Sequence, residues 1–419
     1  MVSIRQRLTS IRRRWLILLA VVGPGIITTT VDNDAGGITT YSVAGAHYGY
    51  ALMWALPVAG LALVFAQEMS ARLGVITGKG LSDLIRERFG VRWTALIIGI
   101  MIFTNWANTV SEFAGVAASM EIFGVSKYIS VPLAAIGVWV LVVKASYKSV
   151  ERIFLLGSAF YLAYVASAIL VRPQWGAVVQ ATFTPQFRFE MDYVILLVTI
   201  IGTTVAPWQQ FYQQSAIADK GLKPKDYQYE LVDVALGVLY AVAVVGFIVM
   251  TCADTLFAGG IRIETAKDAA VALHPLAGPY AATLFALGLL NASLLSSAVL
   301  PLSTAYVVCE AFGWESGISH NLKEAPAFFG IHAALIVLGA GVILLPIKSL
   351  VQTMMASQTL NGVILPIVMI VMLRLVNDKA LLGKYANSRV YNVLAWIIVL
   401  GLIALTAILL GTTLFPRLL

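Results

Sequence analysis

Eleven long apolar segments dominate this sequence and restrict the folds open to it. They cover residues 15–46, 49–73, 94–121, 129–146, 150–171, 192–217, 229–252, 279–309, 327–346, 350–375 and 390–413. Each is long enough to cross a bilayer as a helix, which takes about 20 residues. Of the 419 residues, only 12% are charged, whereas soluble domains carry about 25%. The chain is therefore predicted to be an all-α polytopic membrane protein without a separate soluble domain.

The distribution of basic residues predicts the orientation in the membrane. A basic tail, residues 1–14, precedes the first segment, and most Lys and Arg residues lie on the same side as this tail. The exceptions are Lys127, Arg172, Arg188, Arg262, Lys267, Lys348 and Arg417. By the positive-inside rule, we expect a cytoplasmic N-terminus and an external C-terminus. The first segment is too long for the apolar core of a cleavable signal peptide, so none is expected.

A polar stretch interrupts the first apolar segment. Between Gly23 and Tyr48 the sequence contains Asp32, Asp34 and a glycine pair. A charge at the bilayer centre costs roughly 2.5–3.5 kcal/mol, and glycines weaken the helix further. We therefore predict a broken helix whose unwound centre presents carbonyl and carboxylate oxygens to a cation. The alternative, in which an aspartate only caps the second half-helix, stays open.

A second interruption is predicted in segment 192–217. Gly202 and Pro207 lie near its middle, and proline removes a backbone donor from the helical ladder. We expect this break to leave the carbonyl oxygens of residues 203–206 free. The half-helix that follows is unusually rich in glutamine.

The two interrupted segments lie five segments apart, and this spacing indicates an inverted repeat with a site at the bilayer midplane. The prediction is one transmembrane domain over residues 15–413. Its first repeat covers about 15–171, its second about 192–375, and an extra helix covers about 390–413. Hydropathy and the two breaks support this division.

Polar side chains also gather on faces of other segments. Four recur at spacings of three and four in segment 94–121, namely Asn105, Asn108, Thr109 and Glu112. Such a polar face must point into the helix bundle or into a water-filled cavity. In segment 350–375, Gln358 and Asn361 share a face, and Gln358 could reach a hydrated ion near the two breaks. Hydrogen bonding between helices is the alternative for both faces. Glu68 is expected to pair with a basic neighbour.

Several of these motifs resemble the Nramp family of divalent-metal transporters, over residues 18–376. The resemblance rests on Gly23-Pro24-Gly25 followed by Asp34-Ala35-Gly36-Gly37, on the stretch 73–79, and on Ser357-Gln358 followed by Leu365-Pro366. It implies a LeuT-type fold, with a 5+5 inverted repeat, broken helices 1 and 6 and an eleventh helix. It also implies transport of a divalent cation, which is the expected partner besides the lipid bilayer.

Departures from the family pattern indicate a harder metal site. The family's metal-binding methionine is replaced by Ala206, and its asparagine by Gly37, whereas Asp34 is retained. A thioether favours transition metals, so a site without it suits Mg²⁺, which commonly keeps its waters. Asp32 adds a second charge. The predicted metal site comprises Asp34, Gly37, Val31, Thr203, Ala206, Gln209, Asp32 and Gln358.

The proton-transfer residues of the family are also altered. A histidine is replaced by Gln214 and an aspartate by Thr109, although Glu112 is kept, and the basic pair expected in segment 327–346 is absent. These changes resemble the Nramp-related magnesium transporters, a prokaryotic branch. The resemblance implies uptake of Mg²⁺, and also Mn²⁺, through the inner membrane by alternating access without proton coupling.

Other functions fit the sequence less well than divalent-cation transport without proton coupling. A proton-coupled Mn²⁺/Fe²⁺ symporter lacks its methionine and histidine here, and two aspartates would repel the carboxylate of an amino-acid substrate. An ion channel is disfavoured because two broken helices in an inverted repeat are typical of alternating access. An enzyme is disfavoured because four His and two Cys, widely scattered, form no ligand or triad spacing. No cofactor is expected, and the sequence leaves the oligomeric state open, with a monomer compatible.

Overall fold

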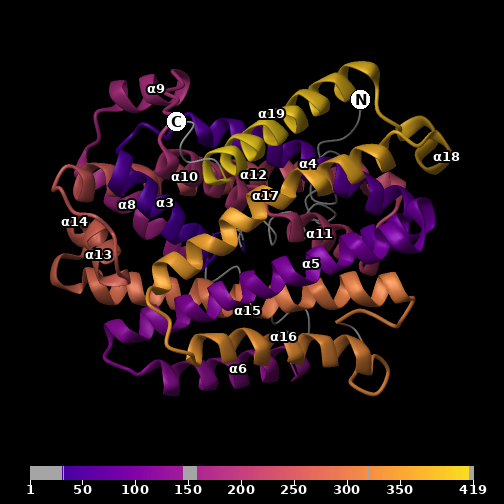
Figure 1. The fold of residues 1–419 in the computed structure, drawn as a ribbon, viewed down its shortest axis with the longest axis horizontal. Helices are drawn as coiled ribbons and strands as arrows, with labels where there is room; N and C mark the ends of the chain where they lie inside the picture. Colours follow the sequence, from indigo (N-terminus) through magenta and orange to yellow (C-terminus); the bar gives the residue numbers. More distant parts are fainter. Residues whose placement is uncertain (1–30, 32, 145–157, 319, 415–419) are drawn as a thin grey trace, which may run out of the picture.

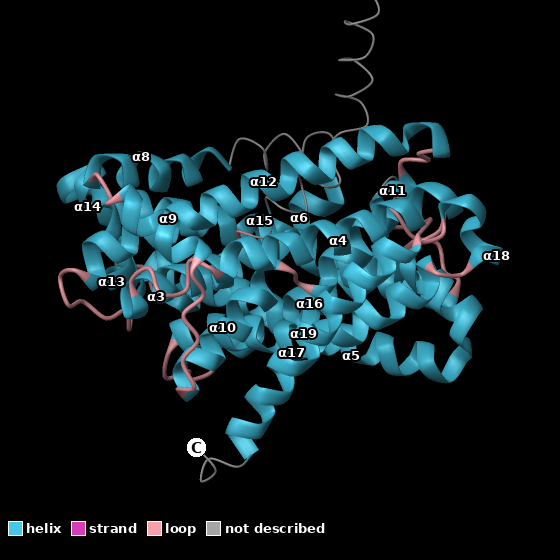
Figure 2. Ribbon diagram, turned by 90° about the horizontal axis from the view of Figure 1, so that it is seen from above, coloured by secondary structure: helices cyan, strands magenta, loops and turns pink. Residues whose placement is uncertain are grey.

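The computed structural model describes residues 31, 33–144, 158–318 and 320–414, and every regular element in this part is helical (Figure 2). The longer helices are α3 (Ala35–Tyr48), α4 (Ala55–Thr77), α5 (Leu81–Ile122), α6 (Lys127–Lys144), α10 (Met191–Thr204), α11 (Pro207–Asp219), α12 (Tyr227–Cys252), α15 (Ala281–Phe312), α16 (Pro326–Leu344), α17 (Leu350–Val376) and α19 (Arg389–Leu414). The shorter helices are α8 (Leu162–Val171), α9 (Trp175–Phe183), α13 (Ala266–Ala270), α14 (His274–Ala277) and α18 (Lys379–Leu382).

The described helices confirm a polytopic all-α membrane protein. Within the described ranges, nine helices are long and apolar enough to cross a membrane, or ten if the bent pair α8–α9 counts as one span. Most of the first predicted segment, including Gly23–Gly25 and Asp32, lies outside the described residues. The prediction of residues 1–14 as a tail lies outside them as well.

Two connections between the predicted segments are partly helical. The connection over residues 172–191 contains α9, which is bent by 119° from α8. The bend follows from Arg172, whose φ of 56° is left-handed, and from Pro173, which cannot continue a helix. A helix also begins at Leu81, and a non-helical kink at Gly90 (φ 74°, ψ 174°) separates it from the span that follows in α5.

Helices that lie far apart in the sequence pack against one another. Helix α5 lies along α15 and packs against α16 and α17, while α4 packs against α11 and α12 (Figure 1). Helices α10 and α17 cross where their backbones touch. A Cβ atom on Gly202 would collide with the carbonyl oxygen of Gln358 and with the backbone of Gly362. This close crossing fixes the position of Gln358 relative to the end of α10.

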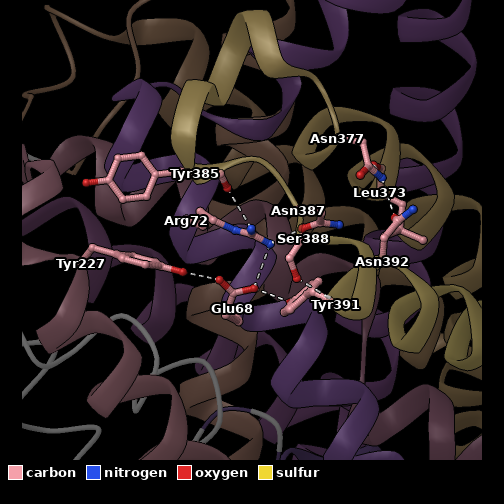
Figure 3. Close-up of polar contacts among 10 residues, drawn as sticks. All are labelled: Glu68, Arg72, Tyr227, Leu373, Asn377, Tyr385, Asn387, Ser388, Tyr391 and Asn392. Atoms are coloured by element: carbon pink, nitrogen blue, oxygen red, sulfur yellow. Dashed lines mark hydrogen bonds and ion pairs between the residues drawn. The ribbon is translucent and has the colours of Figure 1, made fainter.

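A partly buried polar cluster joins α4 to α12 and to the chain that leads into α19 (Figure 3). Glu68 accepts hydrogen bonds from the hydroxyls of Tyr227 and Tyr391. It also pairs with Arg72 at 3.1 Å, so the predicted pairing of Glu68 with a basic neighbour is confirmed. Arg72 further donates to the carbonyl oxygen of Tyr385 at 2.9 Å and to Asn387 Oδ1 at 2.7 Å. We call these residues the Arg72 cluster.

Candidate metal site

The site begins at the start of α3, where the predicted interruption lies. Val31 is helical, Asn33 and Asp34 form a bend, and α3 starts at Ala35. Asp34 has extended backbone angles, and its Oδ1 accepts a hydrogen bond from Gly37 N at 2.6 Å. It is therefore the N-cap of the helix, as the capping alternative predicted. Its carboxylate is only 3% exposed and carries negative charge at the positive end of a helix dipole.

Capping is not the only contact of this carboxylate. Gln358 Nε2, on α17, lies 3.3 Å from Asp34 Oδ1 and 3.1 Å from Oδ2. A Cβ atom on Gly36 would collide with the Gln358 side chain, so glycine at that position allows α17 to approach the start of α3. The structure thus brings together Asp34, Gly37 and Gln358 from the predicted site.

A second carboxylate lies at the same helix start. Glu112 Oε2, on α5, accepts a hydrogen bond from Ala35 N at 3.2 Å, while its Oε1 has no hydrogen-bond partner within the described ranges. The glutamate is fully buried. Gly115 permits this approach, because a Cβ atom there would collide with Ala35 Cβ and with the Ser293 hydroxyl. Glu112 was predicted to face the interior, but its contact with the first residue of α3 was not predicted.

The second predicted break is confirmed. Helix α10 ends at Thr204, Val205 and Ala206 leave the helical conformation, and Pro207 occupies the first turn of α11. The expectation of free carbonyls at residues 203–206 is wrong for Ala206, whose oxygen accepts a hydrogen bond from Gln209 N at 3.1 Å. The tight turn that starts α11 brings that amide back onto the carbonyl. Thr203 Oγ1 is buried and has no hydrogen-bond partner in the described part of the chain.

Helix α10, which leads into this break, packs beside α3. Tyr41, on α3, shares a 2.8 Å hydrogen bond with Thr204, and α10 packs against both α3 and α17. Ala206 and Gln209 are both buried. Both therefore lie in the packed interior of the protein.

Two residues before α3 also have backbone contacts with other helices. Ser296, on α15, lies 3.3 Å from the carbonyl oxygen of Val31, and the Tyr161 hydroxyl donates to the carbonyl oxygen of Asn33 at 2.5 Å. Each carbonyl oxygen has two lone pairs, so one hydrogen bond leaves Val31 able to accept again. The predicted role of Asp32 falls outside the described residues.

The residues predicted to have lost their proton-transfer role make structural contacts. Thr109 Oγ1 donates to the carbonyl oxygen of Asn105 one turn earlier, at 2.8 Å. Gln214 Nε2 donates to the carbonyl oxygen of Lys79 at 2.9 Å and so ties α11 to the α4–α5 connection. Neither contact reaches Asp34 or Glu112.

The chemistry of the site is that of oxygen and amide groups. In the described part of the chain, no group of three or more His, Cys, Asp or Glu side chains is arranged to hold a metal ion. Two carboxylates, the Gln358 amide and backbone carbonyls suit a hard cation that keeps part of its water. A sulfur atom lies one turn before Gln358 in α17, where Met354 Sδ lies 3.5 Å from Thr39 Oγ1.

A cavity of about 590 Å³ lies on the side predicted to be external. Its described lining includes His47, Glu121, Arg262, Glu264 and Lys348, and none of the predicted site residues within the described ranges contributes to it. Asp34 is therefore closed off from this cavity in the conformation described.

A family model described as natural resistance-associated macrophage protein-like (Nramp) matches residues 25–412. The chain belongs to the Nramp family. A Bacillus subtilis relative called divalent metal cation transporter MntH is 27% identical over 412 residues, which are 94% of this chain and 93% of the relative. The protein of the same name from Verminephrobacter eiseniae is 27% identical and covers 98% of this chain and 93% of the relative.

Solved structures show the same fold. The Eremococcus coleocola manganese transporter superposes with a TM-score of 0.79 at 20% identity, over 94% of this chain and 86% of that one. The nucleobase-cation-symport-1 transporter Mhp1 superposes with a TM-score of 0.60 at 14% identity, over 93% of this chain and 89% of that one. The predicted LeuT-type fold is therefore confirmed, whereas the roles predicted for the site residues stay predictions.

Proposed function

We propose that this Nramp-family protein is a secondary transporter that takes up divalent cations, with Mg²⁺ as its preferred substrate and Mn²⁺ as a second one. Transport of divalent metal cations is supported by the names of the relatives that match along almost the whole chain. The observation that carries the proposal is the enclosed carboxylate of Asp34, which faces the Gln358 amide at the start of α3.

The preference for Mg²⁺ rests on what surrounds that carboxylate. At the α10–α11 break the chain offers Ala206, which has no donor atom in its side chain, and Gly37 adds no side chain at the first turn of α3. A site of oxygen ligands with room for water matches an ion that dehydrates reluctantly. In this proposal Val31, Thr203, Gln209 and Asp32 line the hydrated ion. The same features support placement in the prokaryotic magnesium-transporting branch of the family.

We further propose that transport is driven by the ion gradient and membrane potential without a coupled proton. A divalent ion gains about 4.6 kcal/mol per 100 mV on moving to the negative side, twice the value for a single charge. Neither Thr109 nor Gln214 is a titratable relay, and both are engaged elsewhere. The protein would lie in the inner membrane of a prokaryote with its N-terminus in the cytoplasm, and its helices would divide into the two predicted repeats and an extra helix.

A proton-coupled Mn²⁺/Fe²⁺ symporter is the second candidate. It is favoured by Glu112, a buried carboxylate beside Asp34 with one oxygen that has no partner in the described part of the chain. Such a group could carry a proton during the transport cycle.

Competition for uptake separates these candidates. The purified protein is reconstituted in liposomes, and Mg²⁺ uptake is measured with Mn²⁺ or Ca²⁺ as competitors. The proposal predicts saturable Mg²⁺ uptake that Mn²⁺ inhibits. Uptake of Mn²⁺ that excess Mg²⁺ does not inhibit would support the symporter and contradict a magnesium carrier.

A further inference from the structure

Three side-chain amides connect the site carboxylate to α5. Gln358 Nε2 donates to Asp34, and Asn361 Nδ2 donates to Gln358 Oε1 at 2.9 Å. Asn361 and Asn108 then form a mutual pair, with Asn108 Nδ2 to Asn361 Oδ1 at 3.0 Å and Asn361 Nδ2 to Asn108 Oδ1 at 3.1 Å. All four side chains are buried. We call the three amides the amide relay.

The direction of these hydrogen bonds follows from Asp34. An ionised carboxylate only accepts, so Gln358 must turn its NH₂ group toward it. Its oxygen then points away from the site and accepts from Asn361, which must turn its own NH₂ group toward Gln358. The orientation of each amide is therefore set by the charge at one end of the relay.

A cation at Asp34 requires the opposite orientation. A metal ion takes an oxygen ligand, and a water bound to a metal ion donates its hydrogens, so both need an acceptor from Gln358. In the conformation described, Gln358 presents a donor there and its Oε1 faces Asn361. Binding therefore requires the Gln358 amide to reverse, and reversal alone would set its NH₂ group against that of Asn361.

The Asn108–Asn361 pair removes this conflict. Because each asparagine both donates to and accepts from the other, reversing both amides together preserves the two hydrogen bonds between them. The reversed Asn361 then offers its oxygen to Gln358 Nε2. We propose that the amide relay reverses as a unit, presenting a donor to the empty Asp34 and an acceptor to a bound divalent cation or its water.

This inference rests on the proposed function and adds two positioning residues to it. Asn361 and Asn108 do not touch the ion; they set which atom of Gln358 does. The relay stabilises both the empty and the loaded site, so the ion can bind without leaving a buried amide unpaired. A buried amide left without a partner would cost free energy that weakens binding.

One aspartate substitution fixes the relay in the orientation of the loaded site, and a second adds the same charge without fixing it. In Asn361→Asp, the new carboxylate accepts from Gln358 Nε2, which turns Oε1 toward the site. In Asn108→Asp, the two equivalent oxygens of the new carboxylate accept from the Asn361 NH₂ group in either orientation, so Gln358 can still adopt both orientations. Both variants add the same charge, so they are matched for attraction of the cation. Asn105→Asp adds that charge on α5 outside the relay, because Asn105 Nδ2 instead lies 2.9 Å from Thr304 Oγ1.

The dissociation constant for Mg²⁺ is measured by calorimetry on the full chain in detergent, in mildly alkaline buffer. Fixing a hydrogen bond to a charged group is worth about tenfold, so Asn361→Asp should bind Mg²⁺ about tenfold more tightly than Asn108→Asp. Similar tightening in both variants and in Asn105→Asp would show charge attraction alone and overturn the relay. Absence of Mg²⁺ and Mn²⁺ binding by the unaltered protein would instead contradict the proposed function.

A measurement on the unaltered chain tests the relay even if the variants do not fold. Asparagine side chains are labelled with ¹⁵N, and their amide signals are recorded before and after saturation with Mg²⁺. The relay predicts that the signals of Asn361 and Asn108 shift while that of Asn105 stays in place. If the ion binds and the signals of Asn361 and Asn108 do not move, the relay does not reverse.

Discussion

The Arg72 cluster and the Asp34 site both bury a carboxylate between helices, but they satisfy it differently. In the Arg72 cluster, Glu68 faces a cation, and both of its oxygens are hydrogen-bonded (Figure 3). At the site, Asp34 faces only neutral donors, and Glu112 beside it has an oxygen without a partner in the described part of the chain.

This difference indicates that the Arg72 cluster is a structural contact and that the Asp34 site is a binding site for an ion. A buried charge is tolerated when an opposite charge and hydrogen bonds compensate it, as Arg72 does for Glu68. Two neighbouring carboxylates with only amide donors lack such a charge, and a divalent cation would supply it. The Arg72 cluster is therefore predicted to determine stability, and the Asp34 site to determine transport.

The largest expected effect is that of Asp34→Ala. Without the carboxylate, Mg²⁺ and Mn²⁺ uptake in proteoliposomes should fall to the level of empty liposomes, while the protein elutes as a folded monodisperse species. Glu68→Gln is the matched control, since it removes the partly buried carboxylate of the Arg72 cluster and should leave uptake per folded molecule unchanged. Normal uptake by Asp34→Ala would remove the proposed site.

Arg72→Met should act on stability and leave transport intact. Removing this partner leaves Glu68, whose side chain is 13% exposed, as an uncompensated charge. The expected loss of stability is about 3 kcal/mol, measured by chemical denaturation in detergent. Lys79→Met breaks the exposed Lys79–Glu87 pair instead and should cost less than about 1 kcal/mol. Equal losses in the two variants would mean that the Arg72 cluster contributes no more than a surface ion pair.

Ala206→Met combined with Gly37→Asn should change the selectivity of the site. The thioether adds a soft ligand and the amide narrows the pocket. The affinity for Cd²⁺ relative to that for Mg²⁺ should therefore rise about tenfold, or by about 1.4 kcal/mol. The measurement is inhibition of Mn²⁺ uptake by each ion. An unchanged ratio of the two inhibition constants would count against the hard-site argument.

Met354→Leu should have the smallest effect. Its sulfur lies on α17 one turn from Gln358 but is engaged by Thr39 Oγ1 at 3.5 Å. The same ratio of inhibition constants should stay within about twofold, because leucine conserves the volume and no metal ligand is lost. A large loss of Cd²⁺ or Mn²⁺ inhibition would identify Met354 as a soft ligand and bring the site closer to a transition-metal site.

Much of the fold could be predicted from the sequence because lipid imposes simple rules. The spans could be located from hydropathy. The second break could be located from Pro207, because a proline inside an apolar helix breaks or kinks that helix. The mid-span Asp34 was predicted to lie at the helix break for the same reason. In these cases the decisive interaction is between one residue and its own backbone or the bilayer.

The contacts between helices could not be predicted in the same way. The approach of Gln358 to Asp34 depends on the crossing of α10 and α17 at Gly202, and the contact of Glu112 with Ala35 depends on Gly115. The sequence showed polar faces on both α5 and α17, but not that Asn108 would meet Asn361. Hydrogen bonding between helices, which stayed open as an alternative for these residues, is what the structure shows for that pair.

The most direct test of the central claim records Mg²⁺ uptake and internal pH in the same proteoliposomes. With equal pH on both sides, uptake should proceed, should accelerate when the interior is made negative, and should leave the internal pH unchanged. That result is predicted if Asp34 binds the ion and Glu112 carries no proton. Acidification of the interior that scales with Mg²⁺ uptake, and that disappears in Glu112→Gln, would contradict the account.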